Sequence, residues 1–276
     1  MSDLALLLDE DDEALPPLEP VGEADPIGPD GTRYVTMSNA LIRAGHGLSL
    51  SEKRIVALAI AKMDSKGRLR TAPDISRIYA HEYAEAFEVA PNTAYEALQD
   101  AAKQLFKRQI TFYAPVYKRR LKRGEEAPPP TKIQVRWVGV VKYQDGEGWI
   151  ELSWVPELHR HLAGIQKHFT TYKLAQTSAL RSAYSWKLLE LLMRFKTADN
   201  TESWAVYDVD DFRLAMDAPP SSQDFAQLKR RIIDPAVKEL QAKDGWSIQW
   251  KAIKKGRRVA SIEFKFRHND QLRLDI

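Results

Sequence analysis

The chain has 276 residues, which is enough for two domains that each bury a hydrophobic core. It contains no cysteine, no apolar run of about 18 residues and no apolar leader, which excludes disulfides, thiolate metal sites, a membrane span and a secretory signal and predicts a cytoplasmic protein. The formal net charge of +3 is distributed unevenly along the chain.

An acidic segment opens the chain. Residues 1–32 contain ten Asp and Glu, five prolines and no Lys or Arg, a composition typical of a disordered tail. An alternative for the apolar residues 4–8 is a short helix that docks on a partner. The remaining chain has 41 basic and 28 acidic residues and a net charge of +13. Such an excess attracts nucleic acid, although a merely solvated basic surface would have the same charge.

The first half of the chain predicts three helices followed by two strands. Apolar residues at helical spacing predict helices over Ser49–Asp64, about Asp74–Phe87 and Thr93–Gln109. Ser49 or Ser51 is the expected N-cap of the first helix. Alternating apolar residues predict strands over Ile110–Tyr117 and Lys132–Tyr143, joined by a long connection that is basic at its start.

The second half repeats this order. It predicts helices over about Ser178–Thr197, Val209–Met216 and Ser221–Lys243, then strands around Trp246–Trp250 and Ile262–Phe266. A shift of 130 residues superposes the two third helices, with Tyr95, Leu98, Ala102, Phe106 and Ile110 on Phe225, Leu228, Ile232, Ala236 and Leu240. Three helices followed by a two-stranded hairpin are typical of a winged helix. The sequence therefore predicts an α+β fold of two tandem winged-helix domains related by an internal repeat.

We expect three parts along the chain: the acidic tail at residues 1–32, a first winged-helix domain at 33–158 and a second at 159–276. The boundary should fall between Ser153 and Thr170, after the first hairpin. The second domain is expected to read the DNA sequence, and the first to rely on contacts with the DNA backbone.

The third helix of a winged helix enters the major groove, and its hairpin tip lies along a phosphate backbone. On the second long helix, the side opposite the apolar positions carries Gln223, Gln227, Arg230, Arg231 and Lys238. Arg pairs with guanine and Gln with adenine through two hydrogen bonds, worth about 1–3 kcal/mol of discrimination. Arg230 and Gln227 are therefore the predicted base readers, Lys229 a phosphate contact, and Ser221 or Ser222 an N-cap beside a phosphate. A solvated helix face is the alternative.

Basic residues also surround both predicted hairpin tips. The first domain differs in its third helix, whose outward face of Thr93, Ala97, Asp100, Gln104 and Arg108 is mixed in charge. The predicted DNA contacts are Thr93, Lys118, Arg119, Arg120, Ser222, Gln223, Gln227, Lys229, Arg230, Arg231, Lys238, Lys254, Lys255, Arg257 and Arg258. Pro235 removes a backbone donor inside the second long helix, at about 3 kcal/mol, and the sequence gives no functional reason for it.

Three blocks of the chain are similar to the replication initiators of theta-replicating, iteron-bearing plasmids: Ser38–Asp64, Thr170–Phe195 and Phe225–Phe266. The resemblance covers about residues 36–268, and members of that family have two winged helices. Lys229, Arg230 and Arg231 match the basic triplet of the family's recognition helix, and Lys254–Arg258 match its basic wing. The acidic tail departs from the family pattern.

The resemblance implies that monomers bind iteron repeats in duplex DNA at the origin and help to open it. It implies that dimers, formed largely through the first domain, bind an operator inverted repeat and repress the initiator's own gene, and that a conformational change in the first domain separates the two states. It also implies contacts with a host replicative helicase and a host initiator. No catalytic residue, metal or cofactor is expected, and no membrane partner.

A rolling-circle nickase is the enzymatic alternative, because His159, His161 and Tyr172 offer two metal ligands and a nucleophile. The two histidines are predicted to lie on a short helix, where neighbouring side chains diverge. No glycine-rich phosphate loop is present, so ATPase activity is not expected. A winged-helix repressor without an initiator role would share almost every physical feature of this sequence with an initiator. For the first domain, the mixed face at Ala97 and Asp100 also leaves a protein-interaction role open.

Overall fold

The computed structural model describes residues 32–63, 75–114, 131–162, 165, 167–197 and 201–268. The predicted acidic tail up to residue 31 and the basic connection with Lys118, Arg119 and Arg120 lie outside these residues. Within the described part of the chain, no helix is long and apolar enough to span a membrane.

The first half contains β1 (Tyr34–Ser38), α1 (Asn39–Arg43), α2 (Leu50–Ala61), β2 (Ile75–Tyr79), α3 (Ala80–Phe87), α4 (Pro91–Leu105), β3 (Gln109–Ala114), β4 (Thr131–Arg136), β5 (Val138–Tyr143) and β6 (Trp149–Trp154). Ser49 is the N-cap of α2, because its hydroxyl accepts the Glu52 N–H while the Glu52 carboxylate accepts the Ser49 N–H. The helix predicted over Asp74–Phe87 is wrong in its first part, where alternating burial identifies the strand β2.

The hairpins of the first half also differ from the prediction. The residues predicted as one strand, Lys132–Tyr143, form β4 and β5, which are separated by the buried Trp137. β4 pairs with β3, whereas β5 pairs with β6 and β6 with β2. The sheet of the first winged helix is therefore completed by the β5–β6 hairpin. The prediction that Ile110–Tyr117 and Lys132–Tyr143 form this wing is wrong, and β3 and β4 are an additional hairpin.

The second half contains η2 (Pro156–Leu158), α5 (His159–Leu162), β7 (Phe169–Lys173), η3 (Leu174–Thr177), α6 (Ala183–Met193), β8 (Ser203–Asp208), α7 (Val209–Ala215), η4 (Pro220–Ser222), α8 (Phe225–Leu228), the π-helix η5 (Lys229–Ile233), α9 (Asp234–Lys243), β9 (Trp246–Lys255) and β10 (Arg258–His268). The sheet order β8-β10-β9 repeats the order β2-β6-β5 of the first half. Each half thus has the order helix, strand, helix, helix, hairpin, which confirms two tandem winged helices in an α+β fold.

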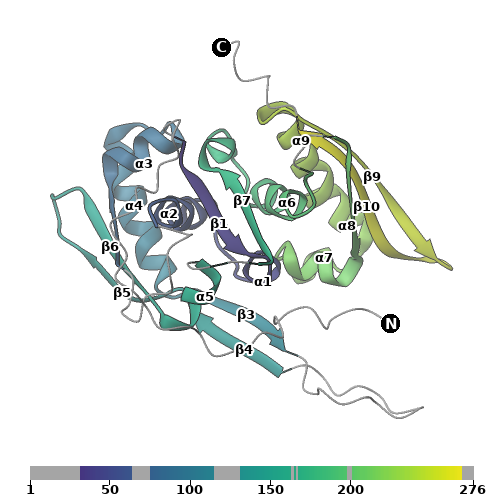
Figure 1. Ribbon diagram of the computed structural model, residues 1–276, viewed down its shortest axis with the longest axis horizontal. Helices are drawn as coiled ribbons and strands as arrows, with labels where there is room; N and C mark the ends of the chain where they lie inside the picture. Colours follow the sequence, from purple (N-terminus) through teal and green to yellow (C-terminus); the bar gives the residue numbers. More distant parts are fainter. Residues whose placement is uncertain are drawn as a thin grey trace.

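Figure 1 shows the two winged helices side by side, with β1 and β7 between them. These two strands pair antiparallel, from Tyr34 opposite Lys173 to Ser38 opposite Phe169. α2 lies on one side of the pair and α6 on the other. The pairing crosses the domain boundary predicted after residue 158, and the buried apolar side chains of both halves form one cluster. The position of the boundary stays a prediction.

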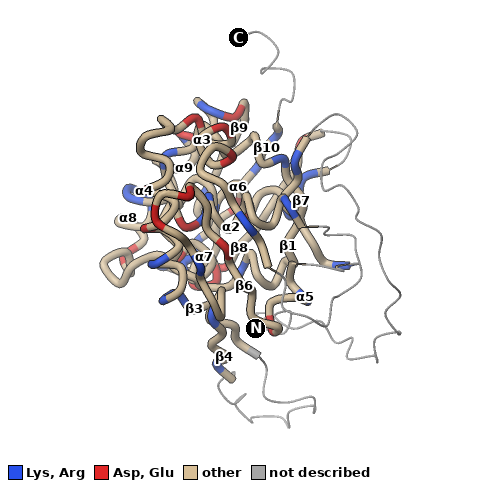
Figure 2. Tube along the Cα trace, turned by 90° about the vertical axis from the view of Figure 1, so that its left-hand side faces the viewer, with Lys and Arg blue, Asp and Glu red and all other residues tan. Residues whose placement is uncertain are grey.

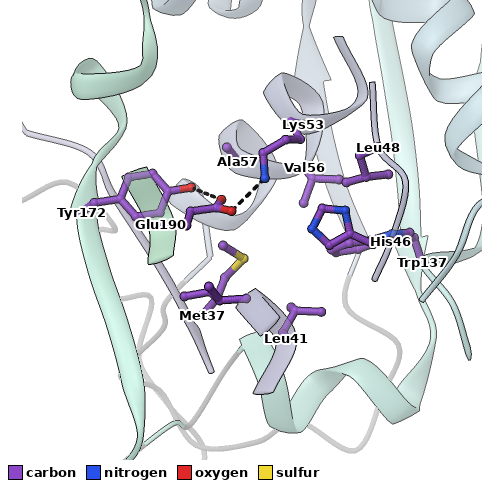
Figure 3. Close-up of a pocket in the computed structure, with 11 residues that line it drawn as sticks. Met37, Leu41, His46, Leu48, Lys53, Val56, Ala57, Trp137, Tyr172 and Glu190 are labelled. Carbon is purple, nitrogen blue, oxygen red and sulfur yellow. Dashed lines mark hydrogen bonds and ion pairs between the residues drawn. The ribbon is translucent and has the colours of Figure 1, made fainter. Parts of the chain in front are cut away.

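A buried ion pair joins α2 to α6 beside this two-stranded sheet. The Nζ atom of Lys53 donates to Oε2 of Glu190 at 2.8 Å, and the side chains are only 5% and 3% exposed. Tyr172 on β7 donates to the other Glu190 oxygen at 3.0 Å and accepts from Nε1 of Trp186 at 3.0 Å. Figure 3 shows Lys53 and Tyr172 both pointing at the Glu190 carboxylate. The halves are therefore joined by charge as well as by apolar packing.

Asp217, two residues after α7, forms a second connection between the halves. Its carboxylate accepts the backbone N–H groups of His46 and Gly47 at 2.9 and 3.0 Å. It also pairs with Lys187 at 2.8 Å. The loop between α1 and α2 is thereby fixed to the second winged helix.

Candidate nucleic-acid interface

Arg213 builds the turn that leads from α7 into the recognition helix. Its guanidinium pairs with Asp210 at 2.7 Å and donates to the backbone carbonyl of Gln223. Asp224 occupies the N-cap position of α8. Ser222, predicted as an N-cap and DNA contact, lies earlier, in η4, and is 1% exposed. This prediction is wrong, because the helix begins later than expected and the hydroxyl is buried.

The recognition helix is the continuous run of α8, η5 and α9. Its buried side consists of Leu228, Ile232, Ile233, Ala236, Val237 and Leu240. The side chains that face away from the core are the exposed Lys229, Arg230, Arg231 and Lys238 and the half-buried Gln227. Gln223 is exposed too, but it lies before the N-cap Asp224 and outside the helix. The predicted contacts that lie within this helix are thus all on its open side, whereas Ser222 and Gln223 precede the helix. That they bind DNA stays a prediction.

Neighbouring side chains hold two of these residues in place. Nη2 of Arg230 donates to Oε1 of Gln227 at 2.9 Å, which aligns the two predicted base readers. Nζ of Lys229 lies 5.6 Å from the centre of the Trp250 ring on β9, and the same ring contacts Phe225 edge-on. Trp250 thereby supports the helix from the hairpin. The sequence predicted only that Trp250 lies on a strand, since this contact depends on tertiary structure.

The β9–β10 hairpin presents a basic tip. It turns at Gly256, whose φ of 65° is a left-handed conformation that glycine adopts without penalty. The four basic side chains around the turn are all exposed: Lys254, Lys255, Arg257 and Arg258. Further along the same hairpin, Lys251 and Lys265 pair with glutamates, whereas no ion pair involves the four tip residues within the described part of the chain. Their charges are therefore available to phosphates.

The third helix of the first winged helix is partly covered. The Tyr95 hydroxyl on α4 donates to the Gln144 carbonyl at 3.0 Å, and the Gln99 amide donates to Asp145 at 2.8 Å. The turn of the β5–β6 hairpin therefore packs against the middle of α4. Thr93 at the start of the helix is exposed and donates to the Ala90 carbonyl, and Glu96, Asp100 and Gln104 are exposed further along. This geometry agrees with the prediction that α4 contributes less to base reading than the recognition helix of the second winged helix.

The two third helices lie on the same side of the molecule. Figure 1 places α4 in the left half and α8 in the right half, and the view from the left in Figure 2 places both labels along one edge. A single duplex could therefore lie across both helices.

The residues considered for a nickase do not form a metal site. His159 and His161 lie on α5, a short helix as predicted. Nδ1 of His161 forms a 2.7 Å hydrogen bond with Oγ of Ser38, and its ring stacks on Phe112. Tyr172 is buried against Glu190. Among the described residues, no group of three or more His, Asp or Glu is arranged to hold a metal.

The burial of His161 predicts a pH dependence of stability. Burial, assisted by Arg160, lowers the pKa of His161 from 6.5 to about 4. Between these two values the unfolded chain binds a proton that the folded protein does not, so the free energy of unfolding should fall on acidification by up to about 1.4 kcal/mol per pH unit. Urea unfolding of the wild type and of His161→Gln between about pH 7 and pH 5 measures this. The variant should have the shallower slope, and equal slopes would contradict the assignment.

Comparisons with known proteins agree with this architecture. Residues 34–193 match the family model described as "Initiator Replication protein, WH1", and residues 208–266 match "Initiator Rep protein, WH2". An "Uncharacterized 27.6 kDa protein" of Escherichia coli is 26% identical over 221 residues, 76% of this chain and 85% of its own length.

A solved structure of the Pi initiator protein in complex with iteron DNA superposes with a TM-score of 0.70 at 20% identity. The match covers 87% of this chain and 98% of that one, and it shows a shared fold. Because the two family models follow each other along the chain and together cover most of it, the protein belongs to the family of initiator replication proteins with two winged-helix domains.

Proposed function

We propose that this protein initiates plasmid replication by binding iteron repeats at the origin as a monomer and helping to open the duplex. The observation that supports this most is the second winged helix, where the aligned Arg230 and Gln227 lie on the same unit as a basic tip that is exposed and forms no ion pair with the described residues. The similar fold of the Pi initiator protein, solved with iteron DNA, agrees with it. The protein acts as a binder and not as an enzyme, so duplex opening draws on binding energy and on a host helicase and host initiator.

The two domains divide this work in the proposal. The second domain, residues 159–276, reads the repeat sequence, and the first, residues 33–158, contacts the DNA backbone through Thr93 and through Lys118, Arg119 and Arg120. As a dimer, formed through the first domain, the protein binds an operator inverted repeat and represses its own gene. The protein acts in the cytoplasm, bound to plasmid DNA.

Replacing Arg230 by alanine should weaken the preference for origin repeats over random duplex by about 1–3 kcal/mol, because one bidentate base contact is lost. Binding of both duplexes is measured across a salt series. Lys243→Ala is the matched control, because Lys243 is an exposed cation in the last turn of the same helix. It should leave the preference unchanged.

The outcomes separate the candidate functions. If the wild type binds repeats and random duplex equally, with only a steep salt dependence, the recognition-helix assignment is wrong. If it prefers the repeats but cannot support replication of a plasmid that carries them, repression of its own gene remains and the initiator role is wrong.

A further inference from the structure

The recognition helix contains a widened turn at the residues proposed to read DNA. η5 spans Lys229–Ile233, and the N–H of Asp234 bonds to the carbonyl of Lys229, five residues back instead of four. Short π turns inside α-helices occur frequently at functional sites. The basic triplet of the helix therefore lies entirely in a turn with non-standard geometry.

Pro235 follows this turn after a single residue, Asp234, and accounts for it. In a continuous α-helix its ring would meet the carbonyl of Arg231, four residues earlier, and it has no N–H to donate there. The structure has Pro235 in the first turn of α9, where a missing donor is tolerated. The widened turn and the proline thus form one unit.

The turn also determines which side chains are buried. Leu228, Ile232, Ala236 and Leu240 are each at most 1% exposed, although they are spaced at intervals of four. In a continuous α-helix each interval of four overshoots a full turn by about 40°, so the last residue would point about 120° away from the first. The π turn absorbs one residue and reduces this angle to about 20°.

The same geometry sorts two pairs of adjacent residues onto opposite sides. Ile232 and Ile233 are both buried, while Arg230 and Arg231 are both exposed. Leu228 points into the core. In a continuous α-helix, the Arg231 side chain would point only about 60° away from the direction of Leu228. The π turn therefore moves Arg231 next to Arg230 on the open side.

We propose that Pro235 is a specificity-determining positioning residue, because the π turn that it enforces directs Arg230 and Arg231 together at the major groove. This inference rests on the proposed function and deepens it: without the turn, Arg230 still faces the DNA but Arg231 does not. Pro235 itself needs no contact with DNA.

Two variants test the inference. Pro235→Ala restores the missing N–H. A second variant carries Pro235→Ala and also lacks Ile233, so a continuous α-helix keeps Leu228, Ile232, Ala236 and Leu240 on one side and the protein can fold. Both should lose at least tenfold in preference for origin repeats, with unchanged affinity for random duplex, which shows that the protein remains folded. The Tm should fall in both, because a continuous helix turns Leu240 from the core in Pro235→Ala and the shortened variant lacks the buried Ile233. Combining Pro235→Ala with Arg231→Ala should cost no more than Arg231→Ala alone, since the proline acts through that arginine.

Each result decides the question. The inference is overturned if both variants keep the wild-type preference for origin repeats. It is also overturned if the losses in preference caused by Pro235→Ala and Arg231→Ala multiply in the combined variant. If only the shortened variant loses its preference for the repeats, the π turn positions the arginines without Pro235, and the role proposed for Pro235 is wrong. If Arg230→Ala and the wild type both fail to discriminate between the duplexes, the proposed function itself fails, which is a distinct outcome.

Discussion

Replacing Glu190 by glutamine should lower the free energy of unfolding by about 3–5 kcal/mol, because the charge of Lys53 would remain in the interior without a partner. Both side chains are almost fully buried, and the pair joins α2 to α6 between the two winged helices. The amide keeps the shape of the side chain and an acceptor for Tyr172, so the change isolates the lost charge. Urea unfolding followed by circular dichroism at neutral pH measures the loss.

Two controls make this prediction specific. The double variant Lys53→Met with Glu190→Gln removes both charges and should recover most of the stability, since an isolated buried charge is the main cost. Glu202→Gln removes a partner from the exposed pair with Lys265 and should change stability by less than about 1 kcal/mol. If Glu190→Gln is as mild as Glu202→Gln, the interior pair does not stabilise the junction of the two halves.

The helices and the hairpin of the second winged helix could be predicted, because their apolar periods are clear and their turn signals are short. The third strand of its sheet, β8, was missed, because the residues that it buries include the small Ser203 and Ala205 and give a weak apolar period. The first winged helix was predicted less well at its hairpins. Asp145-Gly146 lies between Val138–Tyr143 and Trp149–Trp154, and an Asp-Gly pair between alternating strands is a strong hairpin signal. This signal could have identified the β5–β6 wing. The prediction placed the wing at the neighbouring β3 and β4 instead, whose connection is basic.

The internal repeat was predicted correctly only up to the π turn. The shift of 130 residues pairs Phe106 with Ala236, yet Phe106 is 39% exposed and Ala236 is 1% exposed. Leu105, which is fully buried, is the counterpart of Ala236, so the shift becomes 131 once the turn has absorbed a residue. A fixed register cannot anticipate such a bulge. Nor can local patterns predict contacts such as that of Asp217 with the loop at His46, which joins residues far apart in the chain.

Replacing the four tip residues Lys254, Lys255, Arg257 and Arg258 by glutamine should make DNA binding much less dependent on salt. Each phosphate contact contributes about 0.9 to the slope of log K against log salt, so the slope should decrease in magnitude by about 3 to 4. Between about 50 and 200 mM salt, the wild type should lose about a hundredfold more affinity than the variant. Fluorescence anisotropy with repeat and random duplexes measures both slopes.

The preference for repeats should remain in this variant, because phosphate contacts position a protein without reading sequence. Gln substitution of Lys251 and Lys265 is the matched control: both lie on the same hairpin, but glutamates already neutralise them. That control should leave the slope unchanged. An unchanged slope in the tip variant would mean that the hairpin does not lie along the backbone. A lost preference would mean instead that the tip reads bases, which would move part of the specificity from Arg230 and Arg231 to the wing.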